Sequence, residues 1–384
     1  MNLFVELLSA RPNESPHLRI NLHLFKYILE DHPSIVLRPF ATSEMVVWYE
    51  NALPKLLGNS QWQPVVVAKI WANPYLRILF NMVIAPTLFI KNKIDVAIWS
   101  TPGLIPPVPG THQVQRLSNL LPIVDPLSYR NPLQRLFNFI AARVACRRCE
   151  MVVANTQYTR GYIMKYTGAP EHRIAVIPEA TDENIVETLR PAQFPFEKTV
   201  DIVIPSGLYW HKHISLGLKV ARLASKKIGR RLTVWILGGK HPAYHSHLLT
   251  EFSEEFSSGQ FIYKGRIPKE EVWRAIASAK VVLYPSRYES FGIPPLEAMI
   301  LGTPVLLSRI ASHEEVCGQA ATFHEPGSVE DATHKLIPLL AGADAQIQRQ
   351  FEHVKKFSWR KITRQTVEQL EELLKENKSN ARVV

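Results

Sequence analysis

The chain has 384 residues, enough for two domains of ordinary size, and its 46% hydrophobic and 21% charged residues are typical of a globular protein rather than a disordered one. The net charge of +11 favours an anionic partner, such as a nucleotide diphosphate, a lipid surface or nucleic acid. No stretch reaches the ~18 apolar residues of a membrane span. No basic motif interleaved with aromatic residues supports nucleic-acid binding.

Short apolar runs alternate with longer helical patterns along the first half of the chain, which is typical of an α/β domain. The run at Met1–Leu8 has no basic region, so we interpret it as a first strand and not as a signal peptide. The strands that we expect in this half are 3–8, 34–38, 65–69, 96–100, 120–125, 151–155 and 174–178.

The most apolar stretch is Leu76–Ile90, with Lys91 and Lys93 directly after it. We interpret it as a buried helix. Contact with a membrane surface is the alternative, because an apolar helix flanked by lysines is also suited to a lipid interface.

Three cysteines indicate a reducing compartment without a disulfide framework. Cys146 and Cys149 have no second pair that would complete a metal site, and the helical spacing before them makes both small helix residues. We expect His241, His245 and His247 to lie in a solvated loop.

The α/β pattern restarts after a polar linker at Glu179–Lys198, which contains Pro191 and Pro195. The strands that we expect in the second half are 200–206, 232–238, 261–264, 281–284, 305–308 and 321–324. The segment Ser358–Leu374 has apolar residues spaced for one helical face and predicts a final helix.

The segment from Glu289 to Glu297 carries the clearest chemical signal. It follows the expected strand, and Pro294 and Pro295 fit the start of a helix that Gly302 ends. Free N–H groups at such a helix start suit phosphate, whereas the two carboxylates suit hydroxyl groups of a sugar ring and a ribose. The alternative is that the two glutamates have only structural roles, one exposed to solvent and one capping the helix.

In this region the chain resembles the group 1 (family 4) glycosyltransferases. Their motif Pro-Ser-x-x-Glu-x-Phe-Gly-x-x-x-x-Glu-Ala-Met-x-x-Gly-x-Pro-Val is matched throughout from Pro285 to Val305. The resemblance extends over about 199–340, and it is weaker in the first half of the chain. It implies an α/β protein with the GT-B fold, in which two Rossmann-like domains face each other across a cleft and the final helix crosses back to the first domain.

The domains implied by the resemblance are an acceptor-side domain of residues 1–190, joined by helix 357–384, and a donor-binding domain of residues 191–356. The donor is a nucleotide diphosphate sugar. No cofactor is expected, and a metal-independent reaction is implied, because lysine and a helix start take the place of a divalent ion in such enzymes.

The resemblance also assigns site residues. Glu289 contacts the transferred sugar, Glu297 binds the ribose hydroxyls, and Lys212 neutralises the departing diphosphate. The substrate-binding set continues with Gly207, Ser290, Phe291 and Gly292, together with the base-binding loop of Gly265, Arg266 and Ile267. Asp125 is the candidate catalytic residue of the first domain, although a structural Asp at a strand end is an equal alternative there.

The chain departs from the family pattern at three places. Leu208 follows Gly207 where many members have Arg, and the segment 9–15 lacks a Gly-Gly loop. Val124 takes the position of a His that often precedes the residue matching Asp125, and His112 is a candidate substitute for it.

The expected function is therefore a cytoplasmic, retaining hexosyltransferase in polysaccharide biosynthesis. It would move mannose or glucose from a donor such as GDP-mannose or a UDP-hexose to a glycan or lipid-linked saccharide. Peripheral association with the inner face of a membrane would fit a lipid-linked acceptor. The alternative is a non-catalytic nucleotide-sugar-binding or scaffolding protein of the same fold.

Overall fold

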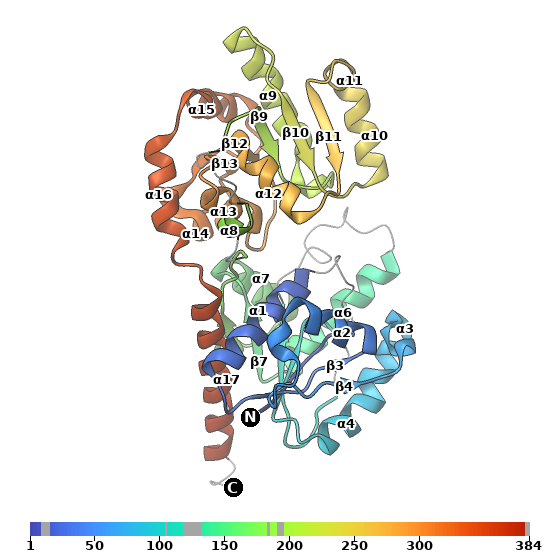
Figure 1. Ribbon diagram of the computed structural model, residues 1–384. Coiled ribbons are helices and arrows are strands. Elements are labelled where there is room, and N and C mark those ends of the chain that lie inside the picture. The colour runs from blue at the N-terminus through green and yellow to red at the C-terminus, as the bar shows by residue number, and fades with distance from the viewer. Residues whose placement is uncertain (9–15, 104–105, 118–131, 183–184, 190–195, 381–384) are drawn as a thin grey trace. The chain divides into compact units, whose positions relative to one another are not determined.

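The computed structural model describes residues 1–8, 16–103, 106–117, 132–182, 185–189 and 196–380. The chain forms two compact units (Figure 1). Unit 1 comprises residues 1–179 and 359–384, and unit 2 comprises residues 180–358. Within the described residues, no helix is both long and apolar enough to cross a bilayer.

Unit 1 is built on a six-stranded parallel sheet of order β2-β1-β5-β6-β7-β8. The strands are β1 (Asn2–Val5), β2 (Val36–Leu37), β5 (Val96–Trp99), β6 (His112–Arg116), β7 (Met151–Ala154) and β8 (Ile174–Val176). A small parallel sheet pairs β3 (Phe40–Ala41) with β4 (Val65–Val66). The helices of unit 1 are α1 (Pro16–Asp31), α2 (Ser43–Ala52), α3 (Pro74–Leu79), α4 (Ala85–Lys91), α6 (Pro132–Arg148), α7 (Gln157–Thr167) and α17 (Trp359–Asn380).

The final helix α17 packs against α1 of unit 1, as expected for a helix that returns to the first domain. The imidazole of His23 on α1 stacks on the indole of Trp359 with 5.0 Å between ring centroids, and Ile362, Val367 and Leu370 are buried. The apolar stripe of this helix therefore covers part of the unit 1 core.

Unit 2 is built on a second parallel sheet of six strands, in the order β11-β10-β9-β12-β13-β14. The strands are β9 (Val200–Ile204), β10 (Val234–Leu237), β11 (Phe261–Gly265), β12 (Ala279–Tyr284), β13 (Val305–Ser308) and β14 (Thr322–His324). The helices are α8 (Ile185–Leu189), α9 (Ile214–Ile228), α10 (Pro242–Glu251), α11 (Ser253–Ser257), α12 (Lys269–Ala277), α13 (Ile293–Ile300), α14 (Ala311–Cys317), α15 (Val329–Ala341) and α16 (Asp344–Val354).

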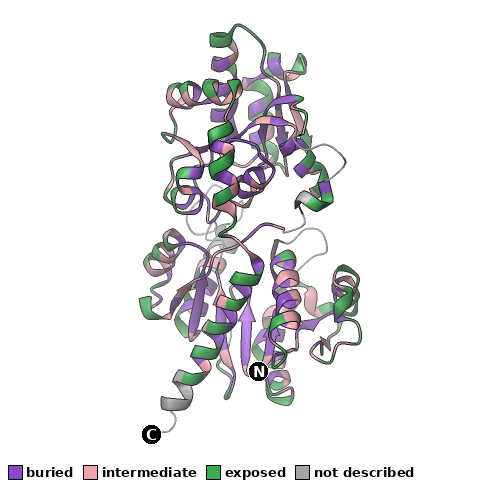
Figure 2. Ribbon diagram, turned by 60° about the vertical axis from the view of Figure 1, so that its left-hand side comes forward, coloured by how far each residue is buried: buried purple, intermediate pink, exposed green. Residues whose placement is uncertain are grey.

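Both faces of the unit 2 sheet are covered by helices, so its central strands β9, β12 and β13 are largely buried on both sides (Figure 2). Val281 and Leu283 belong to one hydrophobic cluster with residues of α9, α10 and α15, whereas Val282 and Tyr284 belong to another with residues of α8, α12 and α13. Burial on both faces explains why these strands are continuous apolar runs in the sequence.

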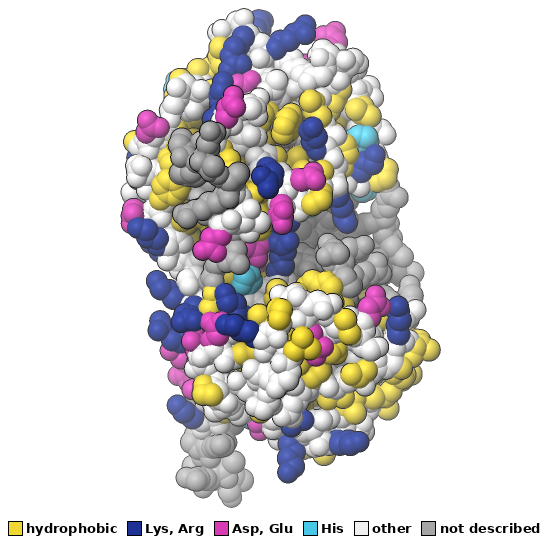
Figure 3. All heavy atoms as spheres, in the orientation of Figure 1, with side chains coloured by type: hydrophobic (Ala, Val, Ile, Leu, Met, Phe, Trp, Pro, Cys, Tyr) yellow, Lys and Arg dark blue, Asp and Glu magenta, His cyan; other side chains and the backbone are white. Residues whose placement is uncertain are grey.

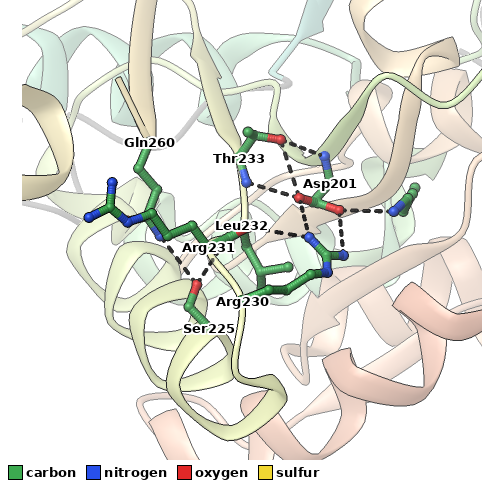
Figure 4. A network of polar contacts seen from close by, with 8 residues as sticks. Asp201, Ser225, Arg230, Arg231, Leu232, Thr233 and Gln260 are labelled. Carbon is green, nitrogen blue, oxygen red and sulfur yellow. Dashed lines mark hydrogen bonds and ion pairs between the residues drawn. The ribbon is translucent and has the colours of Figure 1, made fainter. Parts of the chain in front are cut away.

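The amino ends of the unit 2 strands are fastened by a polar network around Asp201 of β9 (Figure 4). The guanidinium of Arg230 donates two hydrogen bonds to the Asp201 carboxylate, of 3.0 and 2.8 Å, and Lys280 Nζ donates a third of 3.1 Å. The Thr233 backbone N–H adds one of 3.0 Å. Burial alone would raise the pKa of Asp201, but these partners outweigh it and lower the pKa to about 2.

Several local expectations are corrected by the structure. His245 and His247 lie on helix α10, which begins with Pro242, and not in a loop. The stretch Leu76–Ile90 is not a buried helix throughout: it spans α3, a π-helical turn (Phe80–Ile84) and α4, and it buries Phe80 and Phe89 but exposes residues between them. The strand expected at 120–125 lies outside the described residues, and β6 is an additional strand.

The predicted border after residue 190 differs from the division that the structure shows. Ile185 and Leu189 of α8 are fully buried in the unit 2 core, against α12 and α13. The sequence-based division places residues 180–190 in the first domain, whereas in the structure the chain passes from unit 1 to unit 2 between Glu179 and Ala180.

All three cysteines are buried free thiols. Burial raises the pKa of Cys146 and of Cys317 to about 12, and it raises the pKa of Cys149 as well. Buried, protonated thiols are poor nucleophiles and poor metal ligands.

Candidate active site

The candidate site lies at the carboxyl ends of the unit 2 strands. After β9 the chain builds β10 and β11 on one side, and it then returns to add β12 on the other side. The loops that follow β9 and β12 therefore diverge, and this switch point is where open α/β sheets form ligand-binding crevices. Lys212 follows β9 and Glu289 follows β12, so the sheet topology brings the two residues together.

The loop after β9 needs glycine for steric reasons. A Cβ on Gly207 would lie 2.6 Å from the carbonyl oxygen of Gly239, which follows β10. The next residue, Leu208, is fully buried and forms a bridge with Lys240. Its N–H donates to the Gly239 carbonyl at 2.8 Å. Leu208, which stands where many family members have Arg, is therefore part of the core.

Glu289 is held by two partners. Lys212 Nζ lies 2.5 Å from Glu289 Oε1, and the Ser286 hydroxyl donates to the same oxygen at 2.8 Å. Burial acts to raise the pKa of Glu289, but the charge of Lys212 and the two hydrogen bonds outweigh it, and the pKa is lowered. The carboxyl group is thus ionised and can accept hydrogen bonds from hydroxyl groups.

Tyr284 and His313 complete the surroundings of this ion pair, and the sequence did not assign a role to either. Lys212 Nζ donates to the Tyr284 hydroxyl at 3.4 Å. Burial, reinforced by the charge of Glu289, raises the pKa of Tyr284 well above its ordinary value. His313 lay in a segment that matches the family pattern, but its position beside Tyr284, with ring centroids 5.6 Å apart, appears only in the structure.

The imidazole of His313 is neutral. Its Nδ1 lies 2.9 Å from the Ser308 carbonyl, to which only an N–H can donate. Burial lowers the pKa of His313. Nε2 is then an acceptor, and it has no hydrogen-bond partner among the residues that the structure describes.

Helix α13 begins next to these residues. Its N-cap, Gly292, has φ 93°, a left-handed conformation that favours glycine. The Phe291 side chain is buried in the unit 2 core and packs edge-on against Phe357, so any contribution of Phe291 to binding would come from its backbone. The half-buried Ser290 lies between Glu289 and Phe291 in the loop that leads into the helix.

Glu297 lies within α13 and is 1% exposed. Its Oε1 pairs with Nζ of Lys269, the first residue of α12. Its Oε2 is buried and has no hydrogen-bond partner within the described part of the chain. The structure therefore excludes the alternative of a solvated Glu on the helix surface.

The loop after β11 contains the three residues expected near the base. Gly265 has φ 71° and accepts a 2.7 Å hydrogen bond from the Gly238 N–H. Arg266 lies over the loop after β10, since a Cβ on Gly239 would be 2.9 Å from its Nε. Ile267 packs against the unit 2 core. Gly207, Gly239 and Arg266 thus lie close together at the carboxyl edge of the sheet.

Candidate residues of the first half of the chain are not all described. Asp125, Val124 and the segment 9–15 lie outside the described residues. His112 is the first residue of β6, and its backbone N–H donates to Asp95 at 2.8 Å, so it lies at the amino end of that strand and not at the carboxyl edge where open α/β sheets bind ligands.

A polar cluster at the carboxyl edge of the unit 1 sheet was missed by sequence reasoning. Arg116, Asn155 and Glu179 line a cavity of about 20 Å³, and the Asn155 amide donates to Glu179 at 3.3 Å. Burial raises the pKa of Glu179 and lowers that of Arg116. A cavity of this size has room for about one water molecule.

Within the described residues, no group of three or more His, Cys, Asp or Glu side chains is placed to hold a metal ion. The expectation of a metal-independent reaction stays a prediction.

The comparisons with known proteins agree with this arrangement. The family model "Glycosyl transferases group 1" matches residues 186–357, which is nearly all of unit 2. The O-antigen chain mannosyltransferase B of Escherichia coli is 35% identical over 112 residues, which cover 28% of this chain and 29% of that protein. The D-inositol 3-phosphate glycosyltransferase of Nocardioides sp. is 24% identical over 286 residues, which cover 69% of this chain and 61% of that protein.

Solved structures match over nearly the whole chain. A glycosyltransferase from Rickettsia africae aligns with a TM-score of 0.69 at 14% identity, over 97% of this chain and 98% of that chain. Anabaena Alr3699/HepE in complex with UDP and glucose aligns with a TM-score of 0.66 at 15% identity, over 97% and 100%. These likenesses show the fold, which is the GT-B fold with its two Rossmann-like domains.

The chain spans less than two thirds of the length of these curated relatives. The domain formed by residues 186–357 is thus similar to the group 1 glycosyltransferases.

Proposed function

We propose that the chain is a hexosyltransferase that uses a nucleotide diphosphate sugar as its donor and a glycan or a lipid-linked saccharide as its acceptor. The observation that carries this proposal is the ion pair of Lys212 with Glu289 at the switch point of the unit 2 sheet, beside the first turn of α13. It combines a cation for a diphosphate with a carboxylate for sugar hydroxyls.

Each residue has a distinct role in the proposed reaction. Lys212 and the N–H groups at the start of α13 stabilise the diphosphate as the bond from the sugar carbon to the phosphate oxygen breaks. Glu289 accepts hydrogen bonds from hydroxyls of the hexose, and Glu297 accepts them from the ribose. Positive charge from lysine and a helix start makes a metal-independent reaction chemically reasonable.

The proposed stereochemistry is retention. The acceptor hydroxyl attacks the sugar carbon from the face that the nucleotide leaves, and its proton passes to the departing phosphate oxygen. One carbon–oxygen bond forms and one breaks, so the step requires no protein nucleophile. Stabilisation of the departing diphosphate would then supply most of the rate enhancement.

The names of similar proteins support the substrate class. Curated relatives include mannosyltransferases, and solved structures of the same fold contain UDP or UDP-glucose. We propose mannose or glucose as the hexose on these grounds.

A surface of unit 1 supports a lipid-linked acceptor and peripheral membrane association. The segment from Val66 to Ile90 exposes the apolar side chains Val66, Ile70, Leu79, Met82, Val83 and Ile90, to 48% or more each. Figure 3 shows hydrophobic side chains gathered over the part of unit 1 where Figure 1 labels α3 and α4.

The charge of this segment favours an anionic lipid surface as its partner. Between Glu50 and Asp95 the sequence has no acidic residue but carries Lys55, Lys69, Arg77, Lys91 and Lys93. Exposed apolar side chains among basic residues are the pattern of helices that lie in a lipid interface.

One observation favours the non-catalytic alternative. Leu208 is fully buried and cannot supply the positive charge that an Arg would bring to the diphosphate. A binding protein would hold the nucleotide sugar without releasing hexose, whereas a transferase would release the hexose or pass it to an acceptor.

The donor site is tested by titrating the purified protein with UDP, GDP and their hexose conjugates in the absence of added metal. We expect wild type to prefer one base, and we expect Glu297→Ala to weaken binding at least about tenfold, because hydrogen bonds to a charged group are lost. Glu325→Ala removes a carboxylate that is 61% exposed in the same unit and serves as the control. Equal binding by wild type and Glu297→Ala would contradict the proposed site.

A further inference from the structure

A lysine that sequence reasoning did not single out controls the environment of Glu297. Lys269 is 30% exposed, whereas the Glu297 side chain is 1% exposed, and the two form an ion pair within unit 2. A buried carboxylate without a cation is strongly destabilising, so Lys269 compensates the charge of Glu297 in the ligand-free protein.

The two oxygens of the Glu297 carboxylate have different environments. Oε1 is paired with Lys269, whereas Oε2 is buried and has no hydrogen-bond partner in the described residues. Buried acceptors in proteins are nearly always hydrogen-bonded, so Oε2 keeps the capacity to accept a hydrogen bond from a water molecule or from a ligand. A ribose hydroxyl is one such donor.

The location of Lys269 is not explained by helix stability. It is the first residue of α12, and a cation at a helix start opposes the helix dipole. The helix follows Gly265, Arg266 and Ile267 after one further residue, Pro268, and Lys269 Nζ lies 5.6 Å from the ring centroid of Trp273 one turn later. The ion pair thus ties the start of α12 to α13.

Resting on the proposed function, we propose that Lys269 is a positioning residue for ribose recognition: it holds Glu297 Oε1 so that Oε2 accepts a hydrogen bond from a ribose hydroxyl. Lys269 acts through Glu297 and need not touch the nucleotide. The resulting preference for ribonucleotides over deoxyribonucleotides depends on a side chain from a neighbouring helix.

The test compares dissociation constants for UDP or GDP, whichever wild type binds, with those for the 2′-deoxy and 3′-deoxy forms. We expect wild type to prefer the ribonucleotide over at least one deoxy form by about tenfold, as befits one hydrogen bond to a charged group. In Lys269→Met the ratio of the deoxyribonucleotide to the ribonucleotide dissociation constant should fall toward one, and Lys269→Arg should restore the wild-type ratio.

Lys280→Met is the matched control. Lys280 also pairs with a buried carboxylate, that of Asp201, but at the amino ends of the strands. It should keep the wild-type preference for ribose, and thermal unfolding of each variant reports whether the fold is intact.

Two results separate this inference from the proposed function. In the first, wild type binds the nucleotide, and Lys269→Met keeps the wild-type preference for ribose or binds the nucleotide more tightly. This result would overturn the role of Lys269 and leave the proposed function standing. Absence of nucleotide binding in wild type would overturn the proposed function, and the role of Lys269 with it.

Discussion

Lys212 and Glu289 form an ion pair in unit 2, and each of the two side chains is a candidate to bind a different part of the donor. Each is nearly buried, with 17% and 11% of the side chain exposed, so each needs the other in the ligand-free protein. A bound diphosphate would compete with Glu289 for the ammonium group, and sugar hydroxyls would compete for the carboxylate. A donor that supplies both groups can therefore replace the internal partners of this pair.

Asp201 gives a pH-dependent prediction at the scale of one residue. Its pKa is lowered in the folded protein, so its stabilising effect is present above the unfolded value near 3.8 and is lost as the pH falls toward 2. We expect Asp201→Asn to lower the free energy of unfolding by about 2 kcal/mol at pH 7. The difference from wild type should shrink steadily between about pH 4 and pH 2.

Urea unfolding followed by circular dichroism at several pH values measures this difference. Glu352→Gln is the control, because Glu352 forms an exposed surface pair with Lys355 and should change stability by less than about 1 kcal/mol. A stability difference for Asp201→Asn that is independent of pH would contradict the assigned role of its charge.

Sequence reasoning proposed roles for Glu289, Glu297 and Lys212 from the resemblance to a family motif and from their places next to strands and a helix start, and these roles stay predictions. It could not find the partners that define their environment. Glu289 meets Lys212 across 77 positions of the sequence, and Glu297 meets Lys269 from another helix. His313 and Tyr284 come together only because β12 and β13 are neighbours in the sheet.

Whole elements were predictable where burial is uniform. The central unit 2 strands β9, β12 and β13 are largely buried on both faces, and their apolar runs mark them in the sequence. Strand β6 was missed because its core positions include Gln113 and Gln115. One atom of each amide is hydrogen-bonded inside the protein: Trp99 Nε1 donates to Gln113 Oε1 at 2.6 Å, and Gln115 Nε2 donates to the Trp99 carbonyl at 3.1 Å.

The exposed apolar segment of unit 1 makes a prediction at the scale of one element. We expect the wild-type protein to bind vesicles that contain anionic lipid, and to bind less at high salt because screening weakens the attraction. The double variant Met82→Ser and Val83→Ser removes two exposed apolar side chains and should weaken binding about tenfold or more.

Co-sedimentation with vesicles of neutral and anionic composition measures this binding. Leu249→Ser is the matched control, since Leu249 is an exposed apolar residue of α10 in unit 2. Failure of wild type to bind anionic vesicles at low salt would rule out a lipid surface. Equal losses of vesicle binding in Leu249→Ser and in the double variant would contradict a specific role of this segment in lipid binding.

For the whole molecule, the sequence predicted two α/β units and a last helix that returns to the first of them. The structure has two six-stranded parallel sheets, and α17 lies in unit 1. The border between the units was harder to predict, because the short helix α8 lies inside a stretch that contains many polar residues and two prolines, and its two core residues, Ile185 and Leu189, are buried in unit 2.

The most direct test of the central claim is release of hexose from the preferred nucleotide sugar, with and without an acceptor saccharide, followed by NMR of the product. We expect turnover with retention at the anomeric carbon, and about a hundredfold or greater loss of kcat in Lys212→Met and in Glu289→Gln, because both act on charge and hydroxyls at the reacting sugar. Nucleotide-sugar binding without release or transfer to any acceptor saccharide, or turnover that both variants retain, would contradict the account.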